Sequence, residues 1–136
     1  MRCEPFVFAK LPKQMPEAGI YLLSEGSQHL YAGRTNRLRK RLQQHCRDGS
    51  THHSAPFAFR LARVQCNVLT ATYKPQGSRA QLVQDETFAR AFLAAKARLR
   101  TMDIRFVEEA EPARQALLEM YVAISLGTTH NNFDNH

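Results

Sequence analysis

The fold is decided by residues 19–33, which read GIYLLSEGSQHLYAG. Residues 19–24 are rich in β-branched, aromatic and leucine side chains, and residues 29–33 have a similar composition after a turn-like segment at 25–28. Two short apolar segments joined by a glycine-containing turn are typical of a β-hairpin. The sequence therefore predicts two neighbouring antiparallel strands, one carrying Tyr21 and the other Tyr31.

Further elements are predicted outside this hairpin from apolar spacing, helix caps and prolines. The predicted helices run from a cap at Thr35 or Asn36 to about Arg47, from Pro56 through Phe57, Leu61 and Val64, from Glu86 to about Met102, and from Pro112 to Gly127. Residues 103–108 alternate in polarity and predict a third strand, and residues 6–9 predict a short edge strand. The predicted fold class is α+β, with a small, mostly antiparallel three-stranded sheet flanked by helices.

Length and composition indicate one domain in a reducing compartment. The 136 residues fit a proline-rich lead-in at 1–18 and a single domain at 19–136. The three cysteines are odd in number and widely spaced, which excludes a disulfide framework and a CxxC metal site. The chain contains no run of 18 apolar residues and no N-terminal secretory signal. We therefore expect a cytoplasmic protein with no membrane association.

The positive charge is concentrated in one part of the chain. The net charge is +7, and residues 26–84 contain ten Lys or Arg residues and one acid, a balance of +9, while the rest of the chain sums to 9 − 11 = −2. Concentrated positive charge indicates a polyanionic partner, and nucleic acid is favoured over a membrane surface. The structural alternative is a solubilising face.

The last predicted helix contains a single acid in apolar surroundings. Residues 116–126 are apolar on nearly every face of the helix, which predicts that the helix is largely buried, and Glu119 is the only ionisable acid among them. A buried carboxylate must be neutralised, paired with a cation or bound to a metal. The structural alternative is a Glu that extends to an edge or pairs with one Arg.

A second group of candidate residues lies on the hairpin and the helix after it. Arg41 and His45 are four residues apart, so they point the same way from one helix, and Tyr21 and Tyr31 can approach that helix from the sheet. A phenol, a guanidinium, an imidazole and a carboxylate are a usable set for phosphodiester hydrolysis. The structural alternative is core tyrosines beside a solvated Arg and His.

These residues resemble the paired signature of the GIY-YIG nuclease family. Gly19-Ile20-Tyr21 is followed ten residues later by Tyr31-Ala32-Gly33, in which Ala32 replaces the usual Ile or Val. The family places an Arg ten positions and often a His fourteen positions after the second Tyr, where Arg41 and His45 stand. It also places a metal-binding Glu on a later apolar helix with an Asn about twelve residues on, an interval that Glu119 and Asn131 keep; Asn132 is the competitor, because this chain lacks the usual preceding Pro.

The resemblance implies an endonuclease that cuts DNA with one divalent ion, usually Mg²⁺, with Mn²⁺ as an alternative. Tyr21 would be the general base or would position the attacking water, supported by Tyr31 through hydrogen bonding. Arg41 would stabilise the phosphorane, His45 would hold a Tyr or a phosphate, and Glu119 would bind the metal. Gly33 and Asn131 would be supporting residues. Residues 48–102 look like a helical, family-variable insertion.

The basic residues of the charged stretch are predicted to contact the nucleic acid. The predicted contacts are Arg34, Arg37, Arg39, Lys40, Arg60, Arg63 and Lys74. Phe57 and Phe59 are interleaved with them, and core packing is the favoured interpretation of these rings. Two other classes of function stay open: a non-catalytic module of the same fold that binds nucleic-acid structures, and an interaction protein for acidic partners. The sequence does not choose a restriction-, repair- or single-strand-type enzyme, and it leaves the oligomeric state open, a homodimer included.

Overall fold

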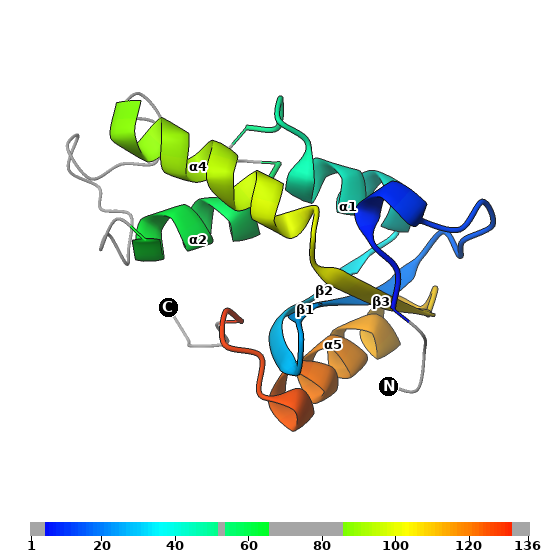
Figure 1. The fold of residues 1–136 in the computed structure, drawn as a ribbon. Helices are drawn as coiled ribbons and strands as arrows, with labels where there is room; N and C mark the ends of the chain where they lie inside the picture. The colour runs from blue at the N-terminus through cyan, green and yellow to red at the C-terminus, as the bar shows by residue number, and fades with distance from the viewer. Residues whose placement is uncertain (1–4, 52–53, 66–85, 132–136) are drawn as a thin grey trace. The chain divides into compact units, whose positions relative to one another are not determined.

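The computed structural model describes residues 5–51, 54–65 and 86–131 of the chain (Figure 1). In chain order the described elements are η1 (Phe8–Lys10), β1 (Gly19–Glu25), β2 (Gln28–Thr35), α1 (Leu38–Cys46), α2 (Pro56–Gln65), α4 (Glu86–Leu99), β3 (Asp103–Glu108) and α5 (Pro112–Leu126). The three strands form one antiparallel sheet in the order β2-β1-β3. The predicted α+β fold class with a three-stranded sheet is therefore confirmed.

The chain divides into two compact units. The first consists of Met1–Leu42 and Thr101–His136 and contains the sheet and α5, while the second consists of Gln43–Arg100 and contains α2 and α4. The second unit nearly coincides with residues 48–102. The interpretation of those residues as an insertion into a single nuclease domain stays a prediction.

The β1–β2 hairpin sets the register on which the candidate site depends. Tyr21 pairs with Gly33 and Leu23 pairs with Tyr31, so both tyrosines project from the same face of the sheet. Gly26 has a φ of 58° in the turn between the strands, a conformation that glycine adopts without steric cost. The predicted hairpin is confirmed, and β2 extends to Thr35.

Helix α5 covers the opposite face of the hairpin. Leu22 and Ala32 form a buried cluster with Val122 and Ala123 of α5, and Leu118 and Leu126 pack against this cluster. The bounds of α5 follow from its caps: the Glu111 side chain accepts from the Arg114 amide at 2.7 Å, and Gly127 ends the helix in the left-handed region. The prediction that Pro112 begins this helix and Gly127 ends it is confirmed.

The prediction that α5 is largely buried is wrong. Several large apolar side chains of α5 are exposed: Leu117 (70%), Tyr121 (69%), Ile124 (68%) and, to a smaller extent, Met120. Only one stripe of a helix can face a sheet, and on α5 that stripe is occupied by Val122, Ala123 and their neighbours. Glu119 is accordingly half-buried at the margin of this stripe.

The lead-in contributes one residue to the sheet. Phe6 forms an isolated antiparallel bridge with Ile104, with backbone hydrogen bonds of 2.7 and 2.6 Å, and its ring stacks on Phe106. The predicted edge strand at 6–9 is otherwise wrong, because Phe8–Lys10 is a 3₁₀ turn closed by a bond from the Lys10 amide to the Val7 carbonyl. The chain therefore leaves the edge of β3 after one residue.

The second unit is built on the packing of α2 against α4. The Phe59 ring lies 5.2 Å from the Phe88 ring and 5.9 Å from the Phe92 ring, and both Phe57 and Phe59 are buried. Core packing of these two phenylalanines is therefore confirmed. The predicted α2 stripe is wrong at Val64, which is exposed. The buried face of α2 includes Phe59 and Ala62 instead.

Two cations, Lys96 of α4 and Arg100 just after it, hold the segment that follows α1 in the second unit. Lys96 is buried and donates to the carbonyls of Asp48 and Ser50, and Arg100 donates to the Cys46 carbonyl at 2.6 Å and to the Asp48 carboxylate at 2.8 Å. Helix α4 ends at Leu99, three residues before the predicted end at Met102, because the chain turns there toward β3. No helix in the described ranges is long and apolar enough to span a membrane.

Candidate active site

The register of the hairpin places the Tyr21 ring over Gly33. A Cβ atom on residue 33 would lie 2.3 Å from both Cζ and Oη of Tyr21, so only glycine leaves room for the ring in this position. Gly19 has a similar role on the other side of β1, where a Cβ atom would lie 2.0 Å from the Val107 carbonyl oxygen of β3. The two glycines thus allow β1 to sit between its neighbours with Tyr21 lying across β2.

Tyr21 and Tyr31 form a hydrogen-bonded pair on one face of the sheet. Their ring centroids are 6.2 Å apart at an angle of 43°, and a hydrogen bond joins the two hydroxyl groups. Tyr21 is 1% exposed and Tyr31 is half-buried. The diagonal relationship of residues 21 and 31 across the hairpin brings their side chains into contact.

Arg41 reaches this pair from α1. Its guanidinium donates to the Tyr21 hydroxyl, and its positive charge lowers the pKa of Tyr21 and of Tyr31. Arg41 is itself half-buried. One cation is therefore held against two phenol groups in a setting with little solvent, where its interactions are stronger than in water.

Glu119 approaches from α5, on the far side of the sheet from the tyrosines. Its carboxylate accepts a hydrogen bond from the backbone amide of Arg34 in β2, and its negative charge raises the pKa of Tyr21 and of Tyr31. Strand β2 is an edge strand, so a side chain from α5 can reach round it. The sequence did not predict that the backbone amide of Arg34 would be a partner of Glu119, because a main-chain donor leaves no signal in the sequence.

The pKa shifts in the site have one main cause. Burial raises the pKa of the Tyr21 phenol far above its ordinary value, and the neighbouring Tyr31 raises it further, while Arg41 lowers it only in part. Burial also raises the pKa of Tyr31 and of the Glu119 carboxyl, and the charge and amide of Arg34 oppose the shift at Glu119. Both phenols are therefore neutral in the protein near pH 7.

Two tyrosines and one arginine thus meet on one face of the sheet, and the charge of Glu119 from α5 acts on both phenols. Residues 17–75 match the family model of the GIY-YIG catalytic domain. This match supports the resemblance of the chain to the GIY-YIG nuclease family. Comparison with curated proteins and with solved structures found no match.

The match to a GIY-YIG catalytic domain supports a nuclease-type function in general. The match includes Tyr21, Tyr31 and Arg41, and it extends into the stretch predicted to be an insertion. It does not include Glu119 or Asn131. The assignment of those two residues therefore depends on where the fold brings them.

Asn131 lies along the outer edge of the GIY-YIG hairpin. Its Oδ1 accepts from the Ala32 amide at 2.8 Å, and its Nδ2 donates to the Ala32 carbonyl at 2.7 Å. The Thr128 hydroxyl donates to the same Oδ1 at 2.7 Å, and the His130 amide donates to the Leu30 carbonyl. Asn131 pairs with β2 as a neighbouring strand would. Its supporting role in the site stays a prediction, and the competitor Asn132 lies outside the described residues.

His45 belongs to the second unit. It is 1% exposed, and its ring lies 6.4 Å from the Phe57 ring in an edge-to-face arrangement. This burial does not favour a direct contact with a solvent-borne phosphate, and the catalytic role of His45 stays a prediction. Burial also raises the pKa of the Cys46 thiol to about 11, as expected for a small buried side chain without reactivity.

The predicted nucleic-acid contacts have different environments. Arg34, Arg37 and Lys40 are exposed, whereas Arg39 is half-buried and donates to the carbonyls of Pro12 and Lys13. In the second unit, Arg60 is half-buried, and Arg63 is 7% exposed with its guanidinium 5.3 Å from the Phe59 ring centroid. Lys74 and the histidine pair at 52–53 lie outside the described residues. The role of all seven residues as nucleic-acid contacts stays a prediction.

The residues of the site fit a divalent ion held by one carboxylate. Among the described residues, no group of three or more His, Cys, Asp or Glu side chains could form a metal cage. Mg²⁺ does not need such a cage, because it commonly keeps several waters and binds one or two carboxylates together with substrate phosphates. The Glu119 carboxylate, half-buried with a raised pKa, gains from a nearby cation.

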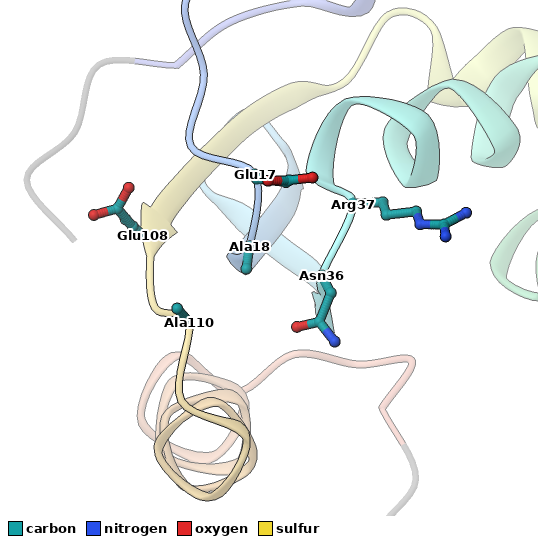
Figure 2. Close-up of a pocket in the computed structure, with 6 residues that line it drawn as sticks. All are labelled: Glu17, Ala18, Asn36, Arg37, Glu108 and Ala110. Carbon is teal, nitrogen blue, oxygen red and sulfur yellow. The ribbon is translucent and has the colours of Figure 1, made fainter.

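One cavity of the first unit is separate from this chemistry. It measures about 430 Å³ and is lined by Glu17, Ala18, Asn36, Arg37, Glu108 and Ala110 (Figure 2). None of the predicted catalytic residues is among them. Two carboxylates on its wall make the cavity a poor site for a phosphate group, and Figure 2 shows the Arg37 side chain extending away from Asn36 and Ala110.

Proposed function

We propose that this GIY-YIG protein is a divalent-metal-dependent endonuclease that hydrolyses phosphodiester bonds in DNA. The observation that carries the proposal is the meeting of Tyr21, Tyr31, Arg41 and Glu119, because Glu119 is almost a hundred residues from Tyr21 in the sequence and its charge acts on both phenols. A purely structural role for a half-buried carboxylate does not require two tyrosines and an arginine beside it.

Arg41 is proposed to stabilise the charge that develops on the phosphate group. Its planar guanidinium has several donors, so it can donate to Tyr21 and to a non-bridging oxygen of the substrate at the same time. Because the site is partly buried, a donor in a fixed position there stabilises a developing charge without reorganisation of solvent.

Tyr21 is proposed to position the attacking water rather than to remove its proton. Burial raises the pKa of Tyr21, and the phenol is therefore a poor base in the protein alone. A neutral Tyr21 can donate its proton to Tyr31 while its oxygen accepts from Arg41 and from water. This arrangement supports the water-positioning role over the general-base role, the two roles that the family resemblance implies.

Glu119 is proposed to hold the divalent ion, with Mg²⁺ as the first candidate and Mn²⁺ as the second. When bound, such an ion would supply positive charge to the phosphate oxygens and lower the pKa of a bound water. The carboxylate keeps free acceptor positions after its bond from the Arg34 amide, because each of its two oxygens has two lone pairs.

The alternative is a module of the same fold that binds nucleic-acid structures without cutting. Cleavage of supercoiled, linear and single-stranded DNA by the wild type, with Mg²⁺, with Mn²⁺ and with EDTA, separates the two and shows which DNA form is cut. We expect Glu119→Gln to abolish cleavage while DNA binding persists, because the exposed basic residues are unchanged. Near-normal turnover of Glu119→Gln would contradict the metal-binding role, and DNA binding without cleavage by the wild type would favour the alternative.

A further inference from the structure

The first unit has a second groove, which is basic. It measures about 330 Å³ and lies between lead-in residues 13–17 and the start of α1. Four cations line it, Lys13, Arg37, Arg39 and Lys40, against one acid, Glu17, a balance of 4 − 1 = +3. A concave surface with this excess of one sign attracts a ligand of opposite charge.

Hydrogen bonds hold both walls of this basic groove. The Arg39 guanidinium donates to the carbonyls of Pro12 and Lys13, the latter at 3.2 Å, and so fixes one end of the lead-in against α1. The Leu38 amide donates to the Glu17 carbonyl at 2.8 Å and fixes the other end. The Arg39 guanidinium therefore donates to the protein backbone, whereas the side chains of Lys13, Arg37 and Lys40 are exposed to solvent.

One residue of the groove, Arg37, precedes Arg41 of the candidate active site by four positions at the start of α1. The Arg41 amide donates to the Arg37 carbonyl at 2.8 Å, so these two residues are one helical turn apart and their side chains leave the same face. A polyanion whose reacting phosphate is at Arg41 can thus present a neighbouring phosphate to Arg37.

We propose that the basic groove binds the phosphate backbone of the nucleic acid on which the enzyme acts, through Lys13, Arg37 and Lys40. The inference rests on the proposed function and adds to it a contact from the lead-in, which lies outside the basic stretch at residues 26–84. It also changes the predicted role of Arg39, which becomes a positioning residue for the Lys13 segment. Recognition of this kind is independent of base sequence, because phosphates are common to all sequences.

The test is a salt titration of binding in the Glu119→Gln background with Mg²⁺, using a labelled 20-base-pair duplex and its single strand. Lys13→Ala should reduce the slope of log affinity against log salt by about 0.9 for duplex or about 0.7 for single strand. Lys10→Ala is the matched control, because Lys10 is an exposed lysine of the same lead-in that does not line the groove. Circular dichroism and urea unfolding establish that each variant is folded.

Arg39 is tested by a double-mutant cycle with Lys13. If Arg39 acts through the Lys13 segment, the single substitution Arg39→Ala lowers the slope of log affinity against log salt. In a protein that already carries Lys13→Ala, the same substitution then causes little further change in the slope. Additive slope changes would make Arg39 a direct phosphate contact and would overturn its positioning role.

The outcomes separate this inference from the proposed function. Equal slopes for Lys13→Ala and Lys10→Ala, in a protein that binds and whose wild type cuts DNA, would overturn the basic groove and leave the nuclease in place. Absence of binding by every variant together with absence of cleavage by the wild type would overturn both.

Discussion

The Tyr21 hydroxyl lies over the Cα atom of Gly33, the residue that pairs with Tyr21 across the hairpin. A Cβ atom at residue 33 would be 2.3 Å from Oη, well inside van der Waals contact. Because the ring is buried between β2 and its other neighbours, it cannot move aside freely. The glycine of the second motif segment therefore determines where the phenol of the first segment sits.

Gly33→Ala should consequently lower the cleavage rate by about 10²-fold, since a displacement of about 1 Å in a catalytic group can have this effect. Overpacking should also lower the free energy of unfolding by about 1–3 kcal/mol. Single-turnover cleavage and urea denaturation measure the two effects. Gly49→Ala is the control, because a Cβ atom there meets nothing within 4 Å and the residue has no positive φ. Wild-type cleavage by Gly33→Ala would show that the Tyr21 position is not critical.

Arg41→Lys should reduce kcat by roughly 10²-fold or more, comparable to the loss of one preorganised donor from a transition-state site. Lysine retains the charge but loses the planar fork that can serve Tyr21 and a phosphate oxygen together. Steady-state kinetics measure kcat and KM separately. Arg47→Lys, at an exposed position directly after α1, should leave both unchanged. A rise in KM with kcat unchanged would instead make Arg41 a ground-state phosphate contact.

Glu119→Gln should stabilise the protein near pH 7 but not near pH 4. Burial raises the pKa of Glu119 in the folded state, so the folded protein holds the proton more tightly than the unfolded chain, whose Glu pKa is about 4.3. Below the unfolded pKa both states are protonated and the stability penalty is absent. As the pH rises through the folded pKa, the wild type loses stability and the difference from Glu119→Gln reaches its full value.

Urea unfolding of both proteins without divalent ions, at pH values from 4 to 8, measures this difference. Its size is limited by the partial exposure of Glu119 and by the nearby Arg34 charge. A difference that does not change with pH would mean that the carboxyl titrates as in the unfolded chain.

Asn131→Asp should weaken the edge of β2 although it is nearly isosteric. A carboxylate can still accept from the Ala32 amide, but it cannot donate to the Ala32 carbonyl, and two acceptors would then face each other. We expect a loss of about 1–3 kcal/mol in unfolding free energy and a lower cleavage rate, since Ala32 adjoins Tyr31. Thermal unfolding and cleavage assays test this. Thr128→Val, which removes the hydroxyl that donates to the Asn131 Oδ1 and lies 3.4 Å from the Ala123 carbonyl oxygen but keeps both Ala32 bonds, should cost less.

Much of the local structure could be predicted from the sequence because its causes are local. The hairpin at 19–33 follows from a glycine turn between apolar segments, and α5 follows from Pro112 and Gly127 at its ends. The cap at Thr35 or Asn36 and the apolar spacing after it likewise placed Arg41 on the helix that follows the hairpin. These patterns act over a few residues, so no knowledge of distant segments is needed to read them.

The sequence could not show which side of α5 would be buried or which cations would be free. The apolar face that contains Leu117, Tyr121 and Ile124 is as hydrophobic as the face on the sheet, and only packing distinguishes them. Arg39 and Lys13 likewise look like ordinary surface cations, yet one holds the lead-in and the other lines the basic groove.

The hairpin with Tyr21 and Tyr31, the helix with Arg41 and the resemblance to a nuclease family could all be read from the sequence, because each depends on residues close together in the chain. Tertiary structure alone decided that Glu119 reaches the Arg34 amide at the edge of β2 and acts on both tyrosines. The physical reason is that this proximity depends on how α5 packs across Leu22 and Ala32. Packing of that kind is settled by contacts between segments far apart in sequence, and no local pattern encodes it.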